Sequence, residues 1–224
     1  MTDNKPTTTL QIETVAKDVL ATIERERERE IVARRFGLFD RRETLEQIGE
    51  LLGITRERVR QLEKAVVTRL KASASSGEIP HVLNFQEMAV QQLLDMGKVA
   101  RISDLSAKLS KDNNKLDQSR VSFLSILCPK LAVVDENDHF YHAVGIASEH
   151  NEKAIRDQVG AIVEAVKAIG EPTTAEMIAE KVKDSSVAHV KSLASVSKLI
   201  ATLNGRWGLT KWPMVNPKNI RDKI

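Results

Sequence analysis

Apolar side chains recur every three or four residues along most of the chain, and this spacing predicts a mainly helical protein. Between Thr9 and Ile23 the apolar positions approximate one helical stripe, which predicts an N-terminal helix within residues 1–24. The Arg- and Glu-rich segment that follows also consists of helix-forming side chains, and we expect it to continue the helix as far as Gly37. Gly37 lacks a Cβ atom and therefore suits the left-handed turn that often ends a helix.

Residues 25–71 are predicted to contain two further helices joined by a tight turn. Thr44 and Gln47 have the spacing of an N-terminal capping box, Gly53 is expected to end the first helix, and Thr55 to cap the second. The expected buried positions are Leu45, Ile48, Leu51 and Leu52 in the first helix, Ile54 in the turn, and Val59, Leu62, Val66 and Leu70 in the second helix. This pattern is typical of a helix-turn-helix.

Small polar residues without periodicity fill residues 72–79, which we expect to be a linker. Residues 80–147 are predicted to form a winged helix. Its expected elements are helices over Asn84–Met96, Ser103–Leu109 and Asp117–Leu127, and a hairpin around the turn at residues 135–138.

Residues 150–213 are predicted to repeat that order, and residues 214–224 to form a C-terminal tail. The expected helices are Asn151–Ile169, stopped by Gly170, a second helix that starts at Thr173 with Glu176 completing a capping box, and a third over His189–Leu203. A short strand then carries Trp207, Leu209 and Trp212. We expect the tryptophan rings to close the core under the wing, with stacking on a nucleobase as the alternative. The predicted fold class is mainly α, with a helix-turn-helix domain followed by two winged-helix domains, each of three helices and a short β-hairpin.

The composition excludes several classes of protein. The chain has 224 residues, of which 42% are hydrophobic and 29% charged, and it contains no run of about 18 apolar residues that could span a membrane. The polar start MTDNKPTTT lacks the layout of a secretory signal, so we expect a cytoplasmic protein with no membrane partner. A single cysteine, Cys128, and five scattered histidines argue against disulfides and a zinc cage.

The remaining candidates for chemistry are weak. Residues 135–138 suggest a calcium loop, but the sixth position lacks Gly and the twelfth lacks Glu, so a hairpin turn is the better interpretation. Cys128 follows an apolar run and is expected to be buried, and His139, Tyr141 and His142 are expected on strand faces. The sequence has no Gly-rich phosphate loop, Ser-His-Asp set or suitably spaced carboxylate pair. We therefore expect no enzyme, no cofactor and no small-molecule substrate.

The charge distribution is more informative than the net charge of +3, because eleven of the sixteen arginines lie between Arg25 and Arg69. Arginine presents paired donors in a planar fork, which suits phosphate groups and guanine. The second helix of the helix-turn-helix places a set of polar side chains opposite its apolar stripe. That set is Arg56, Glu57, Arg60, Gln61 and Lys64.

These residue types are the ones that read base edges in the major groove. Arginine pairs with guanine, glutamine with adenine, and glutamate accepts from cytosine. We therefore expect base reading by Arg56, Glu57, Arg60 and Gln61, and backbone contacts by Thr44, Thr55, Arg58 and Lys64. The alternatives are a protein-binding helix and a solvated helix with Glu–Arg pairs.

The segment REREREIVARRFGLF…TLEQIGELLGITRERVRQLEKAVVTRL, over residues 25–71, resembles region 4 of sigma-70 family factors. That module reads the promoter minus-35 element and docks on bacterial RNA polymerase. The resemblance implies that Arg56, Glu57 and Gln61 meet bases and that Thr44, Arg58 and Arg60 hold the backbone. The sequence departs from the family pattern at Ala65 and Thr68, where basic side chains are usual. This departure puts contacts with activators in doubt.

Residues 1–24 contain no Phe, Tyr or Trp, whereas the helices that melt promoters in this family are aromatic and basic. We therefore expect that the chain does not open a promoter alone. Residues 150–213, above all RWGLTKW, are similar to the HARE-type helix-turn-helix of the RNA polymerase delta subunit. The resemblance leaves open whether this module binds DNA or polymerase, and its basic residues allow nucleic-acid contact: Lys181, Lys183, Lys191, Lys198 and Lys211.

The function expected from the sequence is a DNA-binding transcription factor that reads a minus-35-type element in double-stranded promoter DNA and acts with the RNA polymerase core. One alternative is an accessory module that grips polymerase through Val32 and Phe36, with little sequence-specific DNA binding. Another is a nucleoid-type binder in which all three domains contact DNA without sequence preference.

Overall fold

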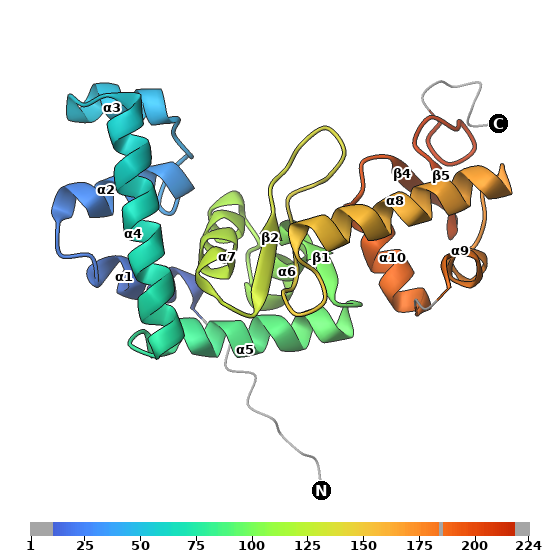
Figure 1. Ribbon diagram of the computed structural model, residues 1–224, viewed down its shortest axis with the longest axis horizontal. Helices are drawn as coiled ribbons and strands as arrows, with labels where there is room; N and C mark the ends of the chain where they lie inside the picture. Colours follow the sequence, from blue (N-terminus) through green and yellow to red (C-terminus); the bar gives the residue numbers. More distant parts are fainter. Residues whose placement is uncertain (1–10, 184–185, 218–224) are drawn as a thin grey trace, which may run out of the picture. The chain divides into compact units, whose positions relative to one another are not determined.

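The computed structural model describes residues 11–183 and 186–217. Its helices and strands follow the order α1 (Ile12–Ala21), α2 (Glu26–Phe36), α3 (Leu45–Leu52), α4 (Arg56–Ser76), α5 (Pro80–Asp95), β1 (Val99–Arg101), α6 (Ile102–Leu109), α7 (Lys115–Leu127), β2 (Leu131–Val134), β3 (Ala143–Ile146), α8 (Glu152–Ile169), α9 (Ala175–Val182), α10 (Val187–Val196), β4 (Ile200–Leu203) and β5 (Arg206–Leu209) (Figure 1). The fold class is therefore mainly α, as the apolar periodicity predicted.

The described chain divides into two compact units. The first unit comprises the described part of Met1–Ala89 together with Ser103–Pro129, and the second comprises Val90–Ile102 with the described part of Lys130–Ile224. The helices of residues 80–129 thus belong mostly to the first unit, and strands β1, β2 and β3 belong to the second. These units cross the boundaries of the sequence modules.

The first unit contains α1 to α4, the beginning of α5, nearly all of α6, and α7. Helix α7 packs against α1, α2 and α4, so the helix-turn-helix shares a core with the N-terminal helix and with the segment after residue 103. The Phe36 and Phe123 rings meet with centroids 5.0 Å apart. Arg120 is buried, donates from Nε to the Leu38 carbonyl at 2.9 Å, and pairs with Asp117 and Glu13.

The second unit combines a three-stranded antiparallel sheet in the order β1-β3-β2 with α8, α9, α10 and the β4–β5 hairpin. One apolar cluster joins these elements, and Trp207 and Trp212 pack against it, which confirms that the rings close the core. Along the chain, α5, β1, α6, α7, β2 and β3 follow the element order of a winged helix. Helices α8 to α10 and the β4–β5 hairpin repeat it, with an isolated bridge from Thr173 to Trp207 in the place of the first strand.

Three predicted helix boundaries in the first unit need correction. Helix does not continue from residue 23, because the Thr22 hydroxyl donates to the Val19 carbonyl at 2.7 Å and Arg29 donates to the Ile23 carbonyl at 2.8 Å, which together hold a break. The predicted linker is helical as far as Ser76, because alanine and serine tolerate helix and Ala74 is fully buried. Helix α5 begins at Pro80 rather than at Asn84.

Two corrections concern residues 173–203. Thr173 exchanges two backbone hydrogen bonds with Trp207, so the cap of α9 is Thr174, whose hydroxyl accepts from the Met177 amide at 3.4 Å. The predicted helix to Leu203 ends at Val196, and Ile200–Leu203 form β4 instead. Asn204 and Gly205 both have positive φ and form the tight turn to β5, so the Asn-Gly hairpin signal outweighed the helical spacing.

Several predicted boundaries are confirmed, including the helix ends at Gly37, Gly53 and Gly170, where each glycine has a left-handed φ. Cys128 is buried, as expected. Thr9 and Leu10 of the predicted first helix and residues 218–224 of the predicted tail lie outside the described residues.

Gly49 fixes the contact between α3 and the turn that follows it. A Cβ atom at this position would lie 2.7 Å from the Ile54 carbonyl oxygen, so Gly49→Ala must push the turn away from α3. We expect this substitution to lower the free energy of unfolding by about 1–3 kcal/mol, measured by urea unfolding with far-UV circular dichroism. The matched control is Gly160→Ala in α8, where a Cβ atom meets nothing within 4 Å. This control should stabilise by about 0.5–1 kcal/mol, and an equal response of both variants would contradict the steric account.

Candidate nucleic-acid interface

Side-chain caps fix where α3 and α4 begin. The Thr44 hydroxyl accepts from the Gln47 amide at 3.2 Å, and the Gln47 side chain accepts from the Thr44 amide at 2.9 Å, so the predicted capping box is present. The Thr55 hydroxyl accepts from the Arg58 amide at 3.2 Å. Each cap satisfies amides that a helix leaves unpaired at its start, and the sequence alone therefore determines both helix starts.

A small apolar core holds α4 from one side. Ile31, Ile48 and Val59 are fully buried together, and Leu45, Leu52, Ile54 and Leu62 pack around them. Figure 1 shows α3 crossing the beginning of α4. Leu51 was expected in this core but is 54% exposed, because the buried stripe of the short helix α3 is centred on Leu45, Ile48 and Leu52.

All eight residues expected to contact DNA are exposed. Six of them lie in the first nine residues of α4, and Thr44 and Thr55 are the caps of α3 and α4. On the opposite side of this part of α4, Val59 is fully buried. The structure thus brings the predicted set together on the exposed side of α4 and at the starts of two adjacent helices.

Glu57 organises the polar face in the free protein. Arg60 donates to both Glu57 oxygens, from Nε at 2.8 Å and from Nη2 at 2.7 Å, and the Gln61 amide donates to Glu57 Oε1 at 3.3 Å. The hydrogen bond from Arg60 lowers the pKa of the Glu57 carboxyl, and the same bond raises the pKa of Arg60. Glu57 and Arg60 therefore both stay charged at neutral pH.

Arg56 has a partner that the sequence analysis missed. Its Nη1 lies 3.0 Å from Oε1 of Glu46 in the first turn of α3, and both side chains are more than half exposed. Spacing along α4 cannot reveal this pair, because the two residues belong to different helices. Such an exposed pair is weak in water, so a stronger acceptor can displace Glu46.

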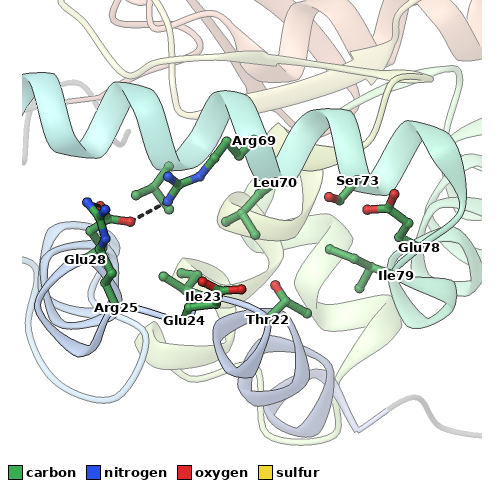
Figure 2. A pocket seen from close by; sticks show the side chains of 11 residues that line it. Thr22, Ile23, Glu24, Arg25, Glu28, Arg69, Leu70, Ser73, Glu78 and Ile79 are labelled. Carbon is green, nitrogen blue, oxygen red and sulfur yellow. Dashed lines mark hydrogen bonds and ion pairs between the residues drawn. The ribbon is translucent and has the colours of Figure 1, made fainter.

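Charged residues of α2 form ion pairs with α4 beside the apolar core. Glu28 is only 5% exposed, and it accepts from Arg69 of α4 and from Arg25 at 3.3 Å. Figure 2 shows the pair of Glu28 and Arg69 at a pocket that is also lined by Ile23, Leu70 and Ile79. Arg35 pairs with Glu63 at 3.2 Å. The alternating Arg and Glu residues of α2 therefore hold α4 in place, a role that their helical spacing did not predict.

Val32 and Phe36, the residues expected to dock on polymerase, do not form an exposed surface. Val32 is fully buried, and the Phe36 ring is half-buried against Phe123. Helix α7 packs against α2, and its Phe123 contacts Phe36. The structure therefore gives no support to docking through these two residues.

The other candidate sites take structural roles. Asn137 Oδ1 accepts from the His139 and Phe140 amides at 2.8 and 3.0 Å, as a turn residue does, so the acidic loop is a turn. Burial raises the pKa of the Cys128 thiol to about 12. Within residues 11–183 and 186–217, no three His, Cys, Asp or Glu side chains are placed to hold a metal ion. Over the same ranges, every helix is too short or too polar to cross a bilayer.

Comparison with known proteins places the similarity in this same segment. Residues 25–72 match the family model of Sigma-70, region 4. The chain is 41% identical over 68 residues to the RNA polymerase sigma factor SigA of Bacillus sp, and 40% identical over 58 residues to the RNA polymerase sigma factor sigB of Arabidopsis thaliana. These alignments cover 30% and 25% of this chain, and the chain spans 18% and 10% of the two relatives. The resemblance of residues 25–71 to sigma region 4 is confirmed, and the HARE-type resemblance of residues 150–213 stays a prediction.

The caps allow a direct stability test at the start of α4. Thr55→Ala leaves the Arg58 amide without its acceptor, so we expect the free energy of unfolding to fall by about 1 kcal/mol in urea unfolding followed by far-UV circular dichroism. Thr68→Ala on the same helix is the control, because the Thr68 hydroxyl only donates back to the Lys64 carbonyl. That variant should change stability by less than about 0.5 kcal/mol. A loss from Thr68→Ala as large as that from Thr55→Ala would rule out a capping effect.

Proposed function

We propose that this protein is a DNA-binding transcription factor whose helix α4 reads a promoter element of the minus-35 type and which acts with RNA polymerase in transcription initiation. It works by recognition and tethering, without catalysis. The observation that carries the proposal is the polar face of α4: Arg56, Glu57, Arg60 and Gln61 are exposed on a helix whose opposite side is fixed by Val59 and the core behind it.

The chemistry of that face matches base edges in the major groove. Arg56 and Arg60 present guanidinium forks to guanine O6 and N7, Gln61 suits adenine, and Glu57 accepts from cytosine N4. In the free protein these side chains satisfy one another and Glu46. Specific DNA must replace those exposed contacts, and a wrong sequence leaves donors unpaired, which is a source of discrimination.

Phosphate contacts set the position of α4 on the duplex. A helix leaves its first amides without intrahelical acceptors, so the starts of α3 and α4 offer donors beside Thr44 and Thr55, and Arg58 and Lys64 add exposed positive charges. With five to seven phosphates neutralised, affinity should fall with a log-log salt slope of roughly −5 to −6.

The match of residues 25–72 to Sigma-70, region 4 supports polymerase as the partner, since the relatives are RNA polymerase sigma factors. Promoter DNA and the RNA polymerase core are therefore the partners we propose, in the cytoplasm. Val32 is buried and the Phe36 ring packs on Phe123, so we place the polymerase contact on other residues.

The winged-helix modules argue against DNA binding by every domain. In a winged helix the third helix is the element that usually enters the groove, and here it corresponds to α7 and α10. Eight of the thirteen residues of α7 are buried, and α10 is packed against β1, α8 and α9. By contrast, all eight residues that we expect to contact DNA are exposed at the starts of α3 and α4, which favours the sequence-reading factor over a nucleoid-type binder.

Two arginines on the same helix separate base reading from backbone contact. Arg56→Ala should weaken binding to the selected site by about 1–3 kcal/mol and reduce the preference for one base at a single position of that site. Arg58→Ala should weaken all sequences alike and reduce the magnitude of the salt slope by about 1. Both effects are measured by fluorescence anisotropy with specific and scrambled duplexes over a range of salt concentrations.

The control variant carries Lys115→Ala and Lys191→Ala, which remove exposed lysines from α7 and α10. Because we place these helices away from DNA, the control should leave affinity and salt slope unchanged. Equal losses on specific and scrambled duplexes for Arg56→Ala would contradict base reading by α4. A smaller salt slope for the lysine variant would favour DNA contact by all domains.

A further inference from the structure

Two histidines meet in the interior of the second unit, outside the proposed DNA interface. His150 lies between β3 and α8, and His189 lies in α10. Their Nε2 atoms are 3.2 Å apart, and the rings are arranged edge to face with centroids 4.8 Å apart. His150 is 1% exposed, so the pair is shielded from water on one side.

The hydrogen bonds determine which nitrogens carry protons. His189 Nδ1 lies 2.8 Å from the Gly97 carbonyl oxygen, which can only accept, so Nδ1 of His189 carries a proton. Nε2 of neutral His189 is then an acceptor, and Nε2 of His150 must donate to it. The remaining nitrogen, Nδ1 of His150, is buried and makes no close hydrogen bond. The pair therefore holds one shared proton between its two Nε2 atoms.

Two glycines make room for this arrangement. A Cβ atom on Gly97 would lie 2.6 Å from the Ala188 carbonyl oxygen, so only glycine lets the turn before β1 approach α10 this closely. A Cβ atom on Gly145 of β3 would lie 2.8 Å from Cβ of His150. Both close approaches therefore require glycine, which has no side chain, at Gly97 and Gly145.

The charged groups around the pair form an ion pair of their own. Lys98 Nζ, in the turn before β1, lies 2.7 Å from Glu149 Oε2, so their charges largely cancel beside the rings. Burial is the main cause that lowers the pKa of His150 below its ordinary value of 6.5, and the neighbouring His189 lowers it further. Glu149 and the Ile146 backbone oppose this shift but do not reverse it.

We propose that His150 and His189 form a proton-sensitive latch that holds α10 against the Gly97 turn and the start of α8, and that releases α10 when both rings are protonated. A first proton binds Nδ1 of His150 and leaves the hydrogen bond between the two Nε2 atoms in place. A second proton, on Nε2 of His189, sets two N–H groups and two positive charges face to face at a distance suited to one hydrogen bond. The contact then becomes repulsive, and His189 separates from His150.

Besides the histidine pair, two hydrogen bonds hold α10 to β1. Ser192 donates from its hydroxyl to the Val99 carbonyl, and Arg101 donates from Nε to the Ser195 carbonyl. The segment from Gly97 to Arg101 thus covers α10 from its first turn to its end. Opening is therefore expected to begin at the first turns of α10, where His189 contacts His150 and Gly97.

The direction of the pH effect follows from linkage. The fold keeps His150 neutral, whereas the unfolded chain binds a proton near pH 6.5, so the contribution of the pair is present above that pH and is lost as the pH falls below it. Each proton that the closed latch excludes changes the opening equilibrium about tenfold per pH unit.

Hydrogen exchange of the full chain, corrected for the intrinsic pH dependence of exchange, tests the latch. Between pH 7.5 and 5.5, protection factors of amides in α10 should fall by up to about tenfold, while those of α8 fall less. His150→Gln removes the buried titrating group and should abolish the extra loss in α10. His139→Gln is the matched control, because His139 is exposed in the same unit and lies outside the pair.

Two further measurements keep the test decisive. Trp207 and Trp212, the only tryptophans in the sequence, pack on the core of this unit, so their fluorescence reports whether each variant folds. Ring-nitrogen NMR of the wild-type chain at pH 7.5 should show protons on Nδ1 of His189 and Nε2 of His150. Another tautomer pair, or α10 protection that is equal at both pH values, would overturn the proposal.

Discussion

The proposed function depends on one constraint: helix α4 must bury one side firmly while leaving the other side entirely in water. Val59 supplies the buried contact with Ile31 and Ile48, and the Thr55 cap fixes where the helix begins. Glu28 and Glu63 extend this support through Arg69 and Arg35, so α2 holds α4 along much of its length. A helix held in this way can present side chains at defined positions, and rigid support is what a recognition surface requires.

Local features of the sequence were sufficient to predict this part of the fold. Thr44, Gly53 and Thr55 act through hydrogen bonds or backbone conformations within a few residues, so their roles can be read directly from spacing. The exposed set on α4 follows from helical geometry in the same way. The sequence did not reveal the burial of Glu28, because a carboxylate is buried only when a partner from another helix, here Arg69, lies beside it.

The predictions that the structure contradicts also involve contacts between residues far apart in the sequence. Val32 and Phe36 were expected at a surface, but Val32 is fully buried and the Phe36 ring packs on Phe123 of α7, from a distant part of the chain. The expected helix to Leu203 stops early because β4 gains a strand partner across the Asn204–Gly205 turn. The burial of α7, where eight of thirteen residues are inside, likewise depends on contacts with helices distant in sequence.

Selection of bound duplexes from a random pool, with and without the RNA polymerase core, tests the central claim most directly. If α4 reads base edges, the wild-type chain enriches one short motif, and polymerase increases the yield of that motif without changing its sequence. If neither selection enriches a motif, α4 does not read sequence and the account is wrong.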